Sequence, residues 1–171
     1  MPILKRRYID VNTLPYQEFD LSIPWLKHIA ITTLDHCLYN ESCKLSVMIV
    51  DDKTIADLNK KYRGLDEVTD ILSFSPSHSG KWYGDRKSAH SVDPSVYFIQ
   101  PEDGIRDLGD IVVSYPEVIR GAAAESLSVT DMMAKLEIHG ILHLVGFDHD
   151  ERPKADEMHA QETLILSCLT A

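Results

Sequence analysis

A run of three histidines near the end of the chain constrains its fold and chemistry more than any other feature. The sequence HGILHLVGFDH spans residues 139–149 and has the spacing H-x-x-x-H-x-x-G-x-x-H. On a helix, His139 and His143 share one face about 6 Å apart along the axis, so both imidazoles can bind one ion. Gly146 stands where a helix ends in a left-handed residue, and the chain can then turn back to bring His149 to the same ion.

Three neutral imidazoles form a ligand set for a transition metal. Zinc is the usual occupant of such a site, and three protein ligands leave one position open, as in catalytic zinc sites. A fourth protein ligand, for which His159 is the candidate, would close the site and make it structural. We expect one Zn²⁺, or Ni²⁺ or another divalent ion, bound by His139, His143 and His149.

Composition predicts a single globular domain over residues 1–171. The net charge of −10 argues against nonspecific, charge-driven binding of nucleic acid across the surface, and leaves Lys5–Arg7 and Lys60–Arg63 as candidates for a local basic groove. Three cysteines without a C-x-x-C pattern predict reduced thiols in the cytoplasm. We expect neither a signal peptide nor a membrane span, because no apolar segment of the required kind is present.

The order of the elements predicts an α+β domain. Apolar alternation indicates strands at residues 8–12, 44–50, 69–74 and 109–114, and caps with apolar stripes indicate helices at about 22–39, 52–62, 116–125 and 130–144 and from 153 onward. The composition of residues 75–107 predicts an insertion or flexible loop. We expect a small mixed β-sheet packed with helices, with the metal site on a helix capped by Thr130 and on the turn that follows.

The histidine spacing also matches metzincin proteases, whose motif is H-E-x-x-H-x-x-G-x-x-H. The glutamate that serves as their general base is replaced here by Gly140. Glu137 cannot easily take its place, because two residues along a helix put it on the opposite side from His139. A zinc metalloprotease without the usual base is therefore the alternative prediction and not the leading one.

Four segments, in this order, resemble the YbeY family of metal-dependent endoribonucleases. They are LNKKYR at 58–63, TDILSF at 69–74, LGDI at 108–111 and the histidine run, and the similarity covers most of the chain outside residues 75–107. The resemblance implies a zincin-like fold and a single-strand-specific endoribonuclease acting in small-subunit ribosomal RNA maturation and ribosome quality control. It also implies single-stranded ribosomal RNA and the small ribosomal subunit or its assembly factors as partners, with no membrane and no DNA.

The resemblance implies roles for individual residues as well. The three histidines match the family's metal ligands, and Arg63 matches its functional arginine, which faces the metal cleft. A guanidinium fork would bind a phosphate better than a lysine does. Asp110 matches a family carboxylate, which would act as a base or orient a ligand. Asp70 is a second candidate for the orienting role, although we favour a turn or cap role for it.

Two positions depart from the family pattern. Phe147 stands where tyrosine is common, which predicts that this position packs and does not react, and Ser75 stands where proline is common.

The sequence leaves two alternatives for the nucleophile that would attack the RNA phosphate, namely water and the ribose 2′-hydroxyl. A non-catalytic ribosome assembly factor with a structural metal is a third prediction.

Overall fold

The computed structural model describes residues 5–14, 19–37, 40–76, 104–149 and 151–169. Its elements are, in order, β1 (Arg7–Thr13), α1 (Ile23–His36), β2 (Cys43–Val50), α2 (Asp52–Arg63), β3 (Ile71–Phe74), β4 (Arg106–Ser114), α3 (Tyr115–Glu125), α4 (Val129–Leu144) and α5 (Arg152–Leu169). The predicted α+β class with a small mixed sheet is confirmed. Within the described ranges, no helix is both long and apolar enough to cross a membrane.

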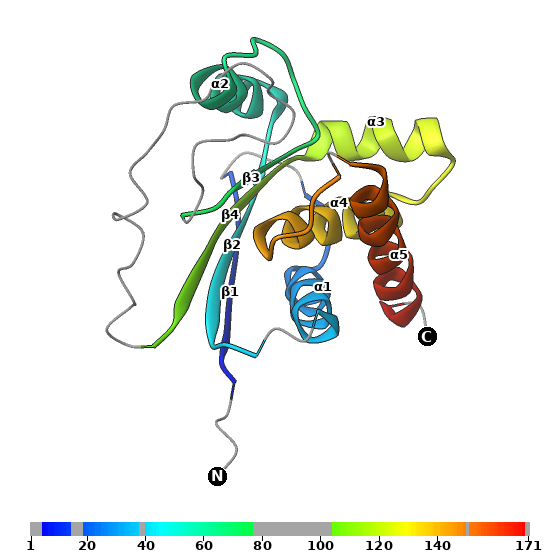
Figure 1. Ribbon diagram of the computed structural model, residues 1–171. Helices are drawn as coiled ribbons and strands as arrows, with labels where there is room; N and C mark the ends of the chain where they lie inside the picture. Colours follow the sequence, from blue (N-terminus) through cyan, green and yellow to red (C-terminus); the bar gives the residue numbers. More distant parts are fainter. Residues whose placement is uncertain (1–4, 15–18, 38–39, 77–103, 150, 170–171) are drawn as a thin grey trace.

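The sheet is mixed because one of its edge strands runs against the others. Its strand order is β1-β2-β4-β3. β1, β2 and β4 are parallel, and β3 pairs with β4 in the antiparallel direction. Figure 1 shows α1, α4 and α5 together beside the sheet, with α2 apart from them near the end of β3. The edge strand β3 therefore lies between α2 and the group of helices that contains α4.

Alternate residues of β4 face two separate cores. Ile111 and Val113 belong to the large core, which includes buried residues of α1 and α4. Val112, which lies between them, packs in a smaller core with Ile55 of α2 and Leu72 of β3. Since successive side chains of a strand point to opposite faces, α2 and α4 lie on opposite sides of the sheet.

Several boundaries differ from the sequence prediction, among them the starts of β3, α4 and β4. The prediction that Thr130 caps α4 is wrong, because the cap is Ser128. The Ser128 hydroxyl oxygen accepts from the Asp131 N–H at 3.0 Å, and the hydroxyl donates to the Asp131 carboxylate at 2.7 Å, which fixes the start of the helix. β4 begins at Arg106 and not at Gly109. Most of the insertion predicted at 75–107 falls outside the described residues, which resume at Gly104.

α4 is the central helix, and it contacts α1, α3, α5, β3 and β4. Its residues are mostly buried, including one carboxylate, Glu137, which is completely inaccessible to solvent. Neither carboxylate oxygen of Glu137 has a hydrogen-bond partner among the described residues. Burial raises the pKa of Glu137 well above its ordinary value near 4.5, because the charged form loses its hydration.

We expect Glu137→Leu to stabilise the protein in a pH-dependent way. Since the pKa of Glu137 is raised on folding, its protonated form favours the folded state, and that contribution is lost as pH rises above about 4.5. The gain from leucine should therefore be larger at about pH 8 than at about pH 5, reaching about 1–3 kcal/mol. Urea unfolding of the metal-free protein at both pH values measures this gain. Glu157→Leu, on the exposed side of α5, is the control, and an equal gain at both pH values would contradict the prediction.

Candidate metal centre

The three histidines lie together in one hollow. The hollow has a volume of about 170 Å³, and it is lined by Arg63, Asp70, Ile71, Leu72, Ser73, His139, His143 and His149. β3 therefore forms one wall, and α4 with the turn after it forms another. The end of α2 completes the lining, so residues from both sides of the sheet meet at the free edge of β3.

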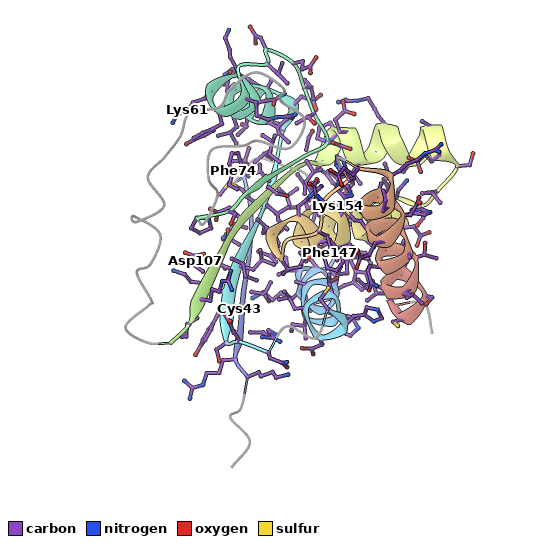
Figure 2. The ribbon with its side chains drawn as sticks, viewed as in Figure 1. Cys43, Lys61, Phe74, Asp107, Phe147 and Lys154 are labelled. Carbon is purple, nitrogen blue, oxygen red and sulfur yellow. The ribbon has the colours of Figure 1, made fainter. Side chains whose placement is uncertain are left out.

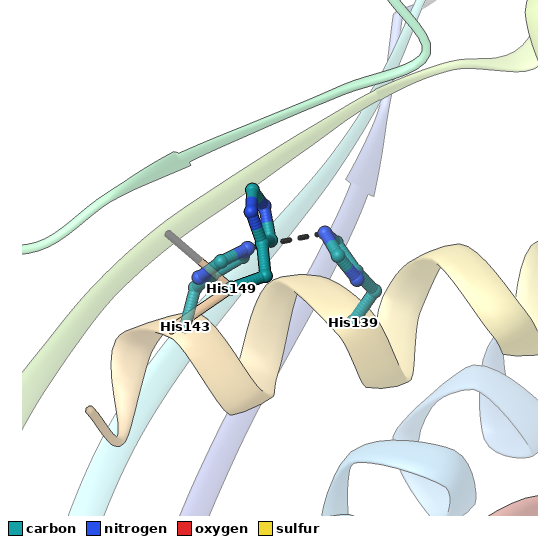
Figure 3. A group of neighbouring side chains, drawn as sticks. All are labelled: His139, His143 and His149. Atoms are coloured by element: carbon teal, nitrogen blue, oxygen red, sulfur yellow. Dashed lines mark hydrogen bonds between the residues drawn. The ribbon is translucent and has the colours of Figure 1, made fainter. Parts of the chain in front are cut away.

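The imidazoles converge on a common point, as Figure 3 shows. The Nε2 atoms of His139 and His143 are 3.1 Å apart. Two tetrahedral Zn–N bonds of about 2.05 Å place their nitrogens roughly 3.3 Å apart, so this spacing suits a shared ion. The ring of His149 lies 4.9 Å from that of His143, and one ligand atom from each of the three residues lies within 4.8 Å of the others.

Hydrogen bonds at the other ring nitrogen orient two of these imidazoles. The Nδ1–H of His143 donates to the carbonyl oxygen of Phe147 at 3.1 Å. Nδ1 of His139 lies 2.7 Å from a carboxylate oxygen of Glu162, which can only accept. Both rings are thereby assigned the tautomer that leaves Nε2 without a proton and directed at the common point.

Electrostatics keeps this centre ready for a cation. Burial, and to a smaller extent repulsion from His139 and His149, lowers the pKa of His143 to about 4, against a weaker opposing effect of the Phe147 carbonyl. The imidazole of His143 is therefore neutral at physiological pH and does not have to lose a proton before it binds a metal.

The turn after α4 brings His149 back, and it depends on Gly146. Gly146 has a φ of +106°, in the region that disfavours side chains. The N–H of Phe147 donates to the carbonyl of Leu142 at 2.9 Å, and the N–H of Gly146 donates to that of His143 at 3.1 Å. These bonds form a Schellman motif. The ring of Phe147 packs against the large core, in agreement with the expectation that this position packs, and Figure 2 places it among the helices.

The donor set fits a divalent transition metal. Three imidazole nitrogens that converge without a carboxylate suit zinc, nickel or a similar ion. In the described part of the chain, the metal-binding group comprises these three histidines, and His159 is outside it. His159 instead lies beside Glu162, with its Nδ1 3.5 Å from a carboxylate oxygen. Among the residues that the structure describes, the arrangement is therefore that of an open site.

Arg63 reaches the hollow from the last turn of α2. Its guanidinium donates to the side-chain oxygen of Asn59 at 3.3 Å. Asn59 is fully buried, and its amide donates to the main-chain carbonyl of Glu67 at 3.0 Å. Asn59 therefore connects the guanidinium to the loop before β3, which holds Arg63 on the side of the hollow facing the histidines.

The two predicted carboxylates lie in different places. Asp70 lines the hollow, and it accepts from the N–H of Ile71 at 2.8 Å, which agrees with a cap role at the start of β3. Asp110 is paired in register with Phe74, whose ring packs against Tyr62 of α2. Paired residues of neighbouring strands share a face of the sheet, so the side chain of Asp110 points to the face opposite α4. There it lines a separate hollow of about 470 Å³. The structure does not bring Asp110 together with the histidines.

Gly140, between the two helical ligands, lets α4 approach β3 closely. A Cβ at this position would lie 2.8 Å from Cδ1 of Ile71, 3.1 Å from Oγ of Ser73 and 3.2 Å from Cδ1 of Ile111. These distances are shorter than ordinary van der Waals contacts. A side chain at the position that carries the general base in metzincins would therefore have to displace Ile71, Ser73 and Ile111 here.

Two residues of the site were missed by sequence reasoning. Glu162 stands in a helix without a motif, and only the packing of α5 on α4 brings it to His139. Asn59 is part of the LNKKYR segment, but no signal in the sequence indicated its contact with Arg63. Burial raises the pKa of Glu162, but its hydrogen bonds and charge interactions with His139 and His159 outweigh this effect and hold the pKa below its ordinary value.

Comparisons with known proteins identify the family. The family model described as Endoribonuclease YbeY matches residues 14–170. A relative named Endoribonuclease YbeY from Dehalococcoides mccartyi (strain ATCC BAA-2266 / KCTC 15142 / 195) is 37% identical over 148 residues, which are 85% of this chain and 81% of the relative. Another from Roseiflexus castenholzii is 37% identical over 162 residues, covering 94% of this chain and 92% of the relative.

A solved structure agrees with the fold. The solution structure of TM1509 from Thermotoga maritima aligns with a TM-score of 0.57 and 20% identity, covering 94% of this chain and 88% of that chain. This structural similarity supports the fold alone, and the family is assigned from the sequence matches. The chain belongs to the YbeY endoribonuclease family.

Proposed function

We propose that this protein is a metal-dependent endoribonuclease that cleaves single-stranded RNA. Its proposed place is in the cytoplasm, in the maturation of small-subunit ribosomal RNA and in ribosome quality control, with the small ribosomal subunit or its assembly factors as partners. One observation supports the chemistry most directly. Three converging imidazoles and one guanidinium line the same hollow, which combines a cation site with a phosphate-binding group.

The residues of the hollow would have two different roles, metal binding and phosphate binding. His139, His143 and His149 would hold the ion, which would supply Lewis acidity toward a phosphoryl oxygen. The Arg63 guanidinium presents N–H donors in a fork that matches two phosphate oxygens. It would bind the scissile phosphate and stabilise the negative charge that develops on it in the transition state.

The dimensions and charge of the hollow favour a single strand as the substrate. A recess of about 170 Å³ beside one edge strand is of the size of a phosphate with its sugar, which suits one nucleotide of a single strand. The last turn of α2 carries Lys60, Lys61 and Arg63, although the chain has a net charge of −10. Lys60 is paired with Asp66 at 2.6 Å, which leaves Lys61 and Arg63 as the charges that would attract RNA. Attraction of RNA would therefore be concentrated at the end of α2.

The two alternatives receive less support. Peptide hydrolysis by the metzincin route needs a carboxylate at position 140, where even a Cβ would be too close to Ile71. A structural metal in an assembly factor needs a fourth protein ligand, and within the described residues the group contains three.

We expect His143→Ala to lose both the metal and RNA cleavage, because two remaining imidazoles bind a divalent ion weakly. Metal content per chain and cleavage of a single-stranded RNA are measured on the same preparation, which also controls for contaminating ribonuclease. His159→Ala should retain one ion per chain. Full cleavage by a verified metal-free wild type would sink the proposal, and loss of the ion from His159→Ala would favour the structural alternative.

We expect Arg63→Glu to retain the metal but lose at least about 100-fold in cleavage rate, equivalent to about 2.7 kcal/mol of transition-state stabilisation. The substitution replaces a phosphate-binding group with one that repels phosphate. Lys53→Glu, in the first turn of α2, makes the same change of charge away from the hollow and should have little effect. Equal losses in the two variants would show a general charge effect and contradict the role of Arg63.

Analysis of the cleavage products distinguishes the two nucleophiles. A 2′,3′-cyclic phosphate end indicates attack by the ribose 2′-hydroxyl, whereas a 5′-phosphate end indicates attack by water. The same RNA and the same wild-type preparation serve for this measurement.

A further inference from the structure

Helix α5 contacts the metal centre through Glu162, which lies beside His139. The following proposal rests on the proposed metal site. We propose that Glu162 is a positioning residue, whose carboxylate accepts the Nδ1–H of His139 and so holds that ring with Nε2 toward the ion. The two atoms are 2.7 Å apart, a distance typical of a hydrogen bond to a charged acceptor. Carboxylates commonly take this place behind metal-binding histidines.

The packing of α5 gives Glu162 a defined position. Met158 and Ile165, four residues before it and three after it, are both buried, so Glu162 lies on the face of α5 that packs inward. Its side chain is 14% exposed. Burying a carboxylate on such a face costs free energy unless the carboxylate is hydrogen-bonded. The partner that Glu162 meets there is His139, a candidate metal ligand.

The two helical histidines are oriented by different acceptors. His143 donates to a main-chain carbonyl at 3.1 Å, whereas His139 meets a carboxylate at 2.7 Å. The carboxylate makes the imidazole more basic and adds a negative charge beside three neutral ligands. His139 should therefore be the ligand whose binding strength depends on a side chain from another helix.

His159 supports this arrangement from the other side of the carboxylate. Its Nδ1 lies 3.5 Å from the second oxygen of Glu162, and its side chain is 82% exposed. Glu162 thus lies between a histidine of the metal centre and a histidine at the surface.

The experiment measures metal binding without RNA, so its result is independent of the proposed ribonuclease activity. Binding of Zn²⁺ is measured by competition with a chromophoric chelator for the wild type, Glu162→Ala and Glu162→Gln. Glu157→Gln removes the same charge from an exposed position of the same helix and is the control. We expect about 10–100-fold weaker binding for Glu162→Ala, a smaller loss for Glu162→Gln and no change for Glu157→Gln.

A second measurement separates positioning from simple attachment of α5 to α4. Heteronuclear NMR of the imidazole nitrogens in the metal-free protein reports which nitrogen of His139 carries the proton. We expect the proton on Nδ1 in the wild type and a shift toward Nε2 in Glu162→Ala. If the alanine variant does not fold, the zinc affinity of Glu162→Gln decides. Zinc affinity within about twofold of wild type in every folded Glu162 variant, or an unchanged tautomer in Glu162→Ala, overturns the proposal.

Discussion

The close approach of α4 to the edge strand β3 at Gly140 determines the form of the site. Because position 140 has no Cβ, the helix comes near enough for β3 to form a wall beside His139 and His143. A side chain at this position, where a metzincin carries its base, would have to displace Ile71, Ser73 and Ile111. One packing contact therefore shapes the recess and also disfavours a carboxylate between the two helical histidines.

The site combines groups supported by two different cores. The helical histidines come from α4, which is packed in the large core. Arg63 comes from α2, whose Ile55 packs in the smaller core on the other face of the sheet. The two cores share the sheet, so β3 sets the separation between the three histidines and the Arg63 guanidinium. The end of α2 contacts β3 directly, because the ring of Tyr62 packs against that of Phe74 with 5.1 Å between their centroids; Phe74 is labelled in Figure 2.

The parts of the site that lie close together in sequence were predictable, and the parts that depend on packing were not. The three histidines and the turn at Gly146 fall within eleven residues, so helix geometry alone relates them. Arg63 was found only through the resemblance to a family, because its distance from the histidines depends on the sheet. Asp110 illustrates the limit, since only the strand register reveals which face its side chain occupies. Glu162 required the packing of α5 on α4, which no local pattern encodes.

The acidic character of the chain gives the basic end of α2 a particular importance. A net charge of −10 weakens nonspecific attraction of RNA over most of the surface. On the proposed function, affinity would come from a few contacts, and the histidine cluster and Arg63 lie in one recess. A phosphate would have to reach both groups to be bound well, so RNA held elsewhere on the surface would gain little. The acidic surface would thereby restrict tight binding to RNA that is placed for cleavage.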